Sequence, residues 1–191
     1  MPADSHSGKD TYMEIDGLLT NRDPNLNIVS PYIGPYYARM LLGLARRKNV
    51  RIITSEPKLE SSKRAVAYIN SRGNRKASLV KWSLYMIVLE AILTLFRMYP
   101  LDFYILPVFI LGWLALYAHY RSGMNLRIRM KVVTKDFIHE KLFISDTKAI
   151  VGSANLTYGG THKNIEHIEV ISDPERIRGL ADHFESLWSS Y

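Results

Sequence analysis

The sequence predicts an α/β domain that is interrupted by a helical hairpin apolar enough to cross a membrane. Short β-branched segments alternate with helical segments in both outer parts of the chain, which is typical of a sheet covered by helices. Between them, in residues 78–120, two apolar runs flank the turn-like sequence MYPLD. We therefore expect one domain split into residues 27–77 and 121–191, with the hairpin inserted at 78–120.

Length and composition agree with this organisation. The chain has 191 residues, enough for a domain of ordinary size or a smaller domain with an insertion. The absence of cysteine excludes disulfides, thiolate–metal sites and a cysteine nucleophile. The chain begins with polar residues of both charges, which is unlike a secretory signal, so we expect residues 1–26 to be a loose tail.

The elements follow from hydrophobic periodicity and turn residues. Expected strands cover residues 27–33, 50–55, 126–133, 139–145, 149–155 and 165–172, and expected helices cover residues 35–49 and 58–70. Gly73 is expected to stop the second of these helices. A last helix is expected to begin at the cap sequence Ser172-Asp173-Pro174 and to run to the C-terminus.

Each apolar run of the hairpin spans about 19 residues, or about 28 Å as a helix, which matches the hydrocarbon thickness of a bilayer. Residues 61–78 and 121–135 contain basic but no acidic side chains, so both flanks and the catalytic domain are expected on the cytoplasmic side of a two-helix, multi-pass protein. Glu90 favours the alternative of a buried hairpin in a soluble core, because a carboxylate at mid-bilayer is costly.

The formal net charge is +7, and the hairpin contributes none of it. A basic surface favours an anionic partner, which could be nucleic acid or lipid headgroups. A surface that is basic only for solubility is the alternative.

Four polar residues are predicted to form one small patch. His139 and Lys141 are two apart on an expected strand and so face the same side, and Ser153 and Asn155 repeat this spacing on the next strand. A three-residue loop, 146–148, would place His139 opposite Asn155 and Lys141 opposite Ser153. An ammonium, a hydroxyl and an amide suit phosphate oxygens, and an imidazole can attack phosphorus.

Two further points concern this patch. Gly152 lacks a side chain and is expected to allow the phosphate to approach closely. The alternative is that His139 and Lys141 are ordinary surface residues of a strand, which is the more frequent situation for such a pair considered alone.

The run HEKLFISDTKAIVGSAN resembles the His-x-Lys-x4-Asp motif and the following Gly-Ser-x-Asn element of the phospholipase D superfamily. The resemblance extends over the polar chain from about Asn27 and implies a phospholipase-D-like mixed sheet flanked by helices. Only five residues separate Asp146 from Gly152, where many members have six. The resemblance implies that His139 is the nucleophile and that Lys141 and Asn155 bind phosphate oxygens, assisted by Ser153. It also implies that Glu166 orients a histidine and that Asp146 stabilises the loop.

The resemblance also implies a second histidine as general acid and base, yet the chain contains a single motif. We therefore expect a homodimer that supplies a second His139. The remaining histidines are expected to be ordinary surface or core residues: His6, His119, His167, His183 and His162, the last of which lies in the GGTHKN loop near the site. No metal and no cofactor are expected, because lysine and amide donors supply the charge stabilisation.

Three functions remain open: a membrane-anchored nuclease, a phospholipase D or phosphatidyltransferase acting on membrane phospholipids, and a non-catalytic phosphate-binding scaffold. Single-motif members of this size resemble nucleases, and the basic charge lies wholly on the polar part of the chain. An anchor would hold the site near lipid headgroups, which favours the second function.

Overall fold

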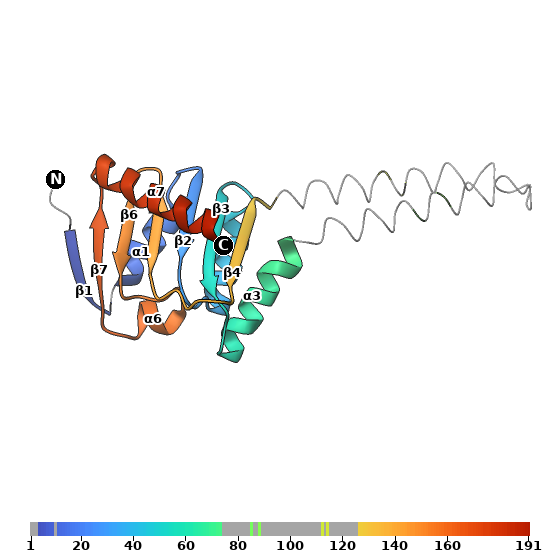
Figure 1. The fold of residues 1–191 in the computed structure, drawn as a ribbon, viewed down its shortest axis with the longest axis horizontal. Helices are drawn as coiled ribbons and strands as arrows, with labels where there is room; N and C mark the ends of the chain where they lie inside the picture. The colour runs from blue at the N-terminus through green and yellow to red at the C-terminus, as the bar shows by residue number, and fades with distance from the viewer. Residues whose placement is uncertain are drawn as a thin grey trace, which may run out of the picture. The chain divides into compact units, whose positions relative to one another are not determined.

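A computed structural model describes residues 4–9, 11–73, 85, 88, 112, 114 and 126–191. These residues form a seven-stranded mixed sheet with helices on both faces (Figure 1). The strand order is β1-β7-β6-β5-β2-β3-β4. Strands β2, β3 and β4 are parallel to one another, whereas the other neighbours pair antiparallel. The predicted mixed α/β sheet is thereby confirmed.

The strands are β1 (Asp4–Gly8), β2 (Asn25–Val29), β3 (Asn49–Ser55), β4 (Ile128–Val133), β5 (Leu142–Ser145), β6 (Ala149–Gly152) and β7 (Glu166–Ile171). The helices are α1 (Thr11–Thr20), α2 (Pro35–Leu44), α3 (Glu60–Gly73), α6 (Tyr158–His162) and α7 (Pro174–Ser190).

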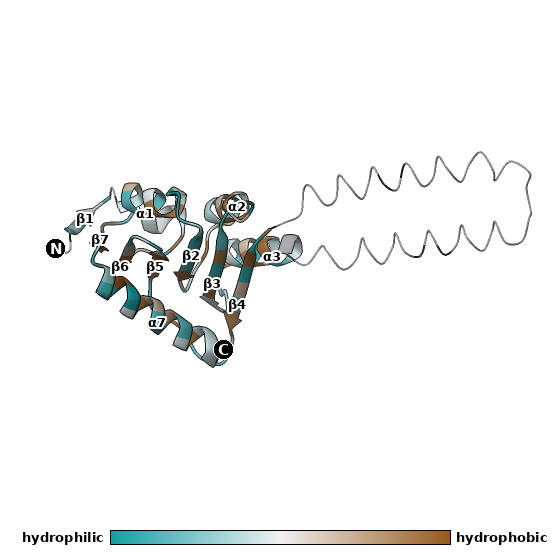
Figure 2. Ribbon diagram, turned by 90° about the horizontal axis from the view of Figure 1, so that it is seen from above, coloured by the Kyte–Doolittle hydropathy of each residue, from teal (hydrophilic) through white to brown (hydrophobic). Residues whose placement is uncertain are grey.

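The sheet lies between two helical layers, with α7 on one face and α1, α2 and α3 on the other (Figure 2). The central strand β5 shows why both faces are covered. Leu142 and Ile144 pack in the α7 layer, while Phe143 packs in the layer of the other helices, and all three are buried. Side chains alternate between the two faces of a strand, so a strand apolar at every position requires cover on both.

The positions at which the helices begin and end largely agree with the prediction. The Asp173 side chain accepts a hydrogen bond from the Arg176 amide at the start of α7, and Pro174 occupies the first turn. Helix α3 runs to Gly73, as expected. Helix α2 ends at Leu44, five residues earlier than predicted, because Ala45 to Lys48 turn the chain into β3.

The expectation of a loose N-terminal tail in residues 1–26 is wrong. Strand β1 pairs antiparallel with β7, and α1 packs on the sheet. Ile15, Leu18 and Leu19 are at most 2% exposed in the larger core cluster. Their i, i+3, i+4 spacing is that of an amphipathic helix, and burial of these three apolar side chains outweighs the charges around them.

Several strands are shorter than predicted, and the polar residues at their ends lie in loops. Strand β5 begins at Leu142 instead of His139, and β6 ends at Gly152 instead of Asn155. Because β2 and β3 run antiparallel to β5, the carboxyl ends of β2 and β3 lie at the same edge of the sheet as the start of β5. We call this edge the His139 edge; the unpredicted helix α6 also lies there (Figure 1).

The chain divides into two compact units, residues 1–71 with 126–191 and residues 72–125. The predicted membrane hairpin at 78–120 lies outside the described residues, apart from four isolated positions, and stays a prediction. In the parts of the chain that are described, no helix has the length and apolar character needed to cross a bilayer.

Candidate functional site

His139 and Lys141 lie together just before β5, at the His139 edge of the sheet. The Lys141 Nζ is 3.1 Å from the His139 Nε2 and also donates to the His139 carbonyl oxygen. An ammonium has only donors, so the Nε2 must accept, and the ring proton then lies on Nδ1. The Nε2 lone pair of His139 thus points at the Lys141 ammonium. His139 itself is exposed.

Lys141 is only 5% exposed. Burial lowers the pKa of its ammonium, and the negative charge of Glu166 partly offsets this. A partly desolvated ammonium interacts more strongly with an anion than one in water does. Lys141 is therefore suited to bind a phosphate oxygen beside His139.

Glu166, at the first position of β7, is 9% exposed and connects two loops of the site. Its carboxylate accepts one hydrogen bond from the Ser153 Oγ, at 2.5 Å, and one from the Asn164 Nδ2, at 3.1 Å. The Ser153 Oγ also accepts from the His167 amide, at 3.1 Å. Among the described residues no hydrogen bond joins Glu166 to His139 of the same chain.

Asn155 follows β6, where the chain turns toward α6. Its Oδ1 is buried and has no hydrogen-bond partner among the described residues. Buried polar atoms are nearly always paired, and an unpaired one at a candidate site indicates a group that binds something else. The Asn155 Oδ1 can accept a hydrogen bond from a ligand donor, whereas a phosphate oxygen would need the Asn155 Nδ2 as its donor.

The predicted pairing of β5 and β6 is wrong by one residue. Leu142 lies opposite Val151, and the Gly152 amide donates to the Lys141 carbonyl, so Lys141 faces Gly152 instead of Ser153. The Ser145 Oγ bonds both the amide and the carbonyl of Lys148, which closes the turn around two loop residues instead of three. Ser153 therefore does not lie across the strand pair from Lys141; it donates to Glu166, whose negative charge acts on the Lys141 ammonium.

The packing of the sheet requires a glycine at position 152. A Cβ built on this residue would lie 2.3 Å from the His167 carbonyl oxygen of the neighbouring strand β7. That carbonyl accepts a hydrogen bond from the Ser153 amide, at 2.9 Å, so it cannot move away freely. Close packing of β6 on β7 thus explains this glycine, and the expectation that it makes room for phosphate stays a prediction.

Asp146 lies at the other end of β5 from His139. Its carboxylate accepts hydrogen bonds from the amide and the side chain of Asn25, at 3.1 and 3.0 Å. The adjacent Thr147 donates to Asp23 from both its amide and its hydroxyl. Asp146 therefore holds the β5–β6 turn against the start of β2 and does not contact His139.

The structure also places residues at the site that the sequence analysis did not single out. Asn164 holds Glu166, and its position directly before β7 was an available signal. Ser55 binds both the amide and the carbonyl of Ile138, and no sequence pattern identified this contact. The His162 ring is stacked between Tyr12 and Tyr158, with centroids 4.4 and 4.3 Å away, so it is engaged in packing.

The residues that the structure describes contain no group of three or more histidine, aspartate or glutamate side chains that could hold a metal ion. The chemistry available at the site is that of the imidazole, the ammonium, the hydroxyl, the amide and one carboxylate.

Comparisons with known proteins identify the fold. Residues 111–188 match the family described as "Cardiolipin synthase, PLD-like domain". A phospholipase D family member, Nuc from Salmonella typhimurium, superimposes with a TM-score of 0.60 at 16% identity, over 98% of this chain and 95% of that one. NucT from Helicobacter pylori superimposes with a TM-score of 0.53 at 14% identity, over 99% and 96% of the two chains.

A third similar structure is the polyphosphate kinase from Porphyromonas gingivalis, with a TM-score of 0.55 at 9% identity, over 98% of this chain and 26% of that one. No curated protein sequence matches the chain. At these identities the structural likenesses establish the fold, which is that of a phospholipase-D-like domain.

Proposed function

We propose that this phospholipase-D-like domain is a metal-independent phosphodiesterase that attacks phosphorus through His139 and that its substrate is nucleic acid. The contact that carries the proposal is the one between the Lys141 Nζ and the His139 Nε2, at 3.1 Å. It presents an imidazole lone pair and a buried ammonium at one point, which is what attack on an anionic diester requires.

The chemistry has two steps. In the first, the His139 Nε2 forms a bond to phosphorus while the bond from phosphorus to the leaving oxygen breaks, and an acid gives that oxygen a proton. In the second, the same acid, now a base, takes a proton from water, which attacks phosphorus and displaces Nε2. Lys141 and the Asn155 amide hold the non-bridging oxygens, and Ser153 with Asn164 keeps Glu166 in place.

The acid is proposed to be His139 of a second copy. Three other described histidines have partners elsewhere: His167 bonds Ser5, His183 bonds Glu140, and His162 is stacked between tyrosines. The exposed His139 can meet its counterpart across a two-fold axis, where each surface faces an identical one. Glu166 has no bond to its own His139, so it is available to the histidine of the other subunit.

The choice of nucleic acid is supported by the basic charge of the chain, which lies wholly outside residues 78–120 and favours a polyanionic partner.

A phospholipase or phosphatidyltransferase is the second candidate. It is favoured by the description of the family that matches residues 111–188, which names cardiolipin synthase. A non-catalytic phosphate-binding scaffold is the third candidate. The contact between His139 and Lys141 is evidence against it.

The deciding experiment offers the detergent-solubilised full chain single-stranded DNA, RNA and labelled phospholipid side by side. We expect cleavage of nucleic acid that is lost in His139→Ala and that persists in excess EDTA. Turnover of phospholipid alone would overturn the choice of substrate, and loss of activity in EDTA would overturn the metal-independent mechanism.

We also propose that residues 78–120 form the membrane anchor, on the basis of their two apolar runs and basic flanks. Replacing Val80 to His119 by a short linker should yield a protein that stays in the supernatant after ultracentrifugation without detergent. Aggregation of this variant through an exposed core would contradict the anchor.

A further inference from the structure

An exposed aromatic side chain stands next to the proposed nucleophile. The Phe137 ring centroid is 6.0 Å from that of His139, and the two planes are tilted by 38°. Phe137 is 48% exposed, although it belongs to a side-chain type that is usually buried. The active-site chemistry described above gives this ring no role.

The backbone holds Phe137 and His139 on the same side. Between them, Ile138 is 8% exposed and packs in the α7 core layer. Its amide and carbonyl both bond the Ser55 Oγ, at 2.8 and 3.0 Å. Phe137 and His139 are exposed on either side of the buried Ile138, so the anchor at Ile138 holds both rings on one solvent-facing side.

Two side chains from other segments complete the surroundings of the Phe137 ring. Tyr32, which follows β2, lies with its ring centroid 6.0 Å away at an angle of 51°. Lys58, which precedes α3, places its Nζ 5.9 Å from the ring centroid. The tyrosine ring packs beside the phenyl ring, and the ammonium adds a positive charge next to it.

We infer that Phe137, braced by Tyr32 and flanked by Lys58, is the stacking site for a nucleobase next to the diester that His139 attacks. This inference rests on the proposed function and assigns it a single-stranded substrate, because a base must leave its helical stack to lie on a side chain. An aromatic face with a nearby cation is the combination that single-stranded nucleic acids bind, through a base and a phosphate respectively.

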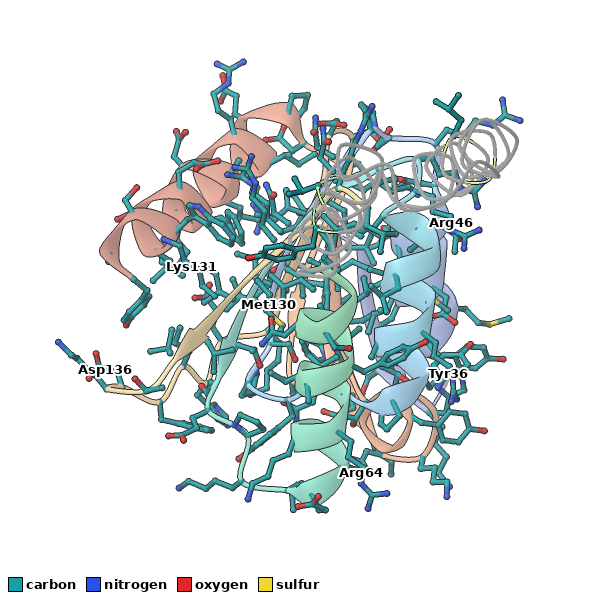
Figure 3. The ribbon with its side chains drawn as sticks, turned by 90° about the vertical axis from the view of Figure 1, so that its right-hand side faces the viewer. Tyr36, Arg46, Arg64, Met130, Lys131 and Asp136 are labelled. Atoms are coloured by element: carbon teal, nitrogen blue, oxygen red, sulfur yellow. The ribbon has the colours of Figure 1, made fainter. Side chains whose placement is uncertain are left out.

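Insertion into a bilayer is the main competing explanation, since Leu59, beside Lys58, is 59% exposed. Asp136 argues against it. This carboxylate directly precedes Phe137, is exposed, and projects outward from the loop between β4 and β5 (Figure 3). A carboxylate carried into hydrocarbon is costly, whereas beside a stacked base it stays in water.

The test measures stacking without cleavage. The full chain in detergent, carrying His139→Asn, is titrated with a dinucleotide that contains 2-aminopurine, whose fluorescence falls when it stacks on an aromatic ring. A dinucleotide has a single internal diester, which fixes the position of the base relative to His139. Phe137→Trp, Phe137→Leu and Phe137→Ala are compared on this background.

We expect Phe137→Trp to keep both the affinity and the quenching, and Phe137→Leu and Phe137→Ala to lose the quenching and about tenfold in affinity. A dinucleotide that lacks the base should bind all four proteins equally. Leucine keeps the apolar volume without the π-face, so retention of binding by Phe137→Leu would overturn the stacking site in favour of an apolar contact.

Two other outcomes would also overturn the inference. Equal binding by all variants would mean that no base lies on Phe137, and dissociation of the Phe137→Ala dimer in light scattering would assign the ring to the contact between copies. The proposed function fails separately, if protein with an intact His139 cuts phospholipid and no nucleic acid. Quenching on the His139→Asn background is measured independently of that result.

Discussion

At the scale of single residues, Lys141 determines how activity should depend on pH. Burial lowers the pKa of its ammonium. The charged form binds phosphate, so kcat/KM should fall as the pH rises through the lowered pKa, below the ordinary alkaline range of a lysine. In Lys141→Arg the side chain stays charged, and this alkaline decline should disappear from the pH–rate profile even if the absolute rate is lower. An unchanged decline would assign it to another group.

Lys141 should also affect stability in a defined direction. A lowered pKa means that the folded state binds fewer protons than the unfolded state, so this residue makes the protein more stable as the pH rises toward the ordinary pKa of a lysine. The buried ammonium is thus unfavourable for folding at neutral pH. Its proposed role is to bind the substrate phosphate.

The bond between Ser153 and Glu166 is the second residue-scale prediction. We expect Glu166→Gln and Ser153→Ala each to lower kcat by more than they raise KM, because both changes disturb the group proposed to orient a histidine. The double variant should lose less than the sum of the two, since the partners share one contact. Additive losses in steady-state kinetics would show that the two residues act independently.

At the scale of elements, α1 is a structural helix and not part of a tail. Ile15→Ala should lower the free energy of unfolding by about 2–5 kcal/mol, because Ile15 is fully buried. Met13→Ala, on the exposed side of the same helix at 63% exposure, is the matched control and should change stability by less than about 0.5 kcal/mol. Thermal or urea denaturation measures both, and equal effects would contradict the packing of α1.

The helices and strands also show which structural features a local sequence pattern can predict. The cap at Asp173 and the apolar strands near Ile52 and Phe143 were predictable, because caps and continuous apolar runs are local signals. The register of β5 and β6 was not, since it depends on the bonds of Ser145 with Lys148 and of Thr147 with Asp23. A one-residue error in register transfers each side chain to a different partner.

At the scale of the whole molecule, the proposed dimer makes a prediction about mixtures. One site that uses His139 from both subunits is inactive if either subunit carries His139→Ala. Co-expressed at equal amounts, wild type and variant should give about one quarter of the wild-type activity, whereas independent subunits would retain about one half. A variant on the solvent side, Met13→Ala, is the control and should leave the activity of the mixture unchanged.

By itself, the sequence determined the mixed α/β class, the polar motif from His139 to Asn155 and the likeness to phospholipase D. These features depend on periodicity and motif spacing, which are properties of residues close together in the chain. The tertiary structure alone decided that β1 and α1 belong to the domain, that Asp146 lies away from His139, and that Ser153 donates to Glu166. It also brought Tyr32, Lys58 and Phe137 together from three separate segments. Contacts between distant segments depend on strand order and register, which no local pattern specifies.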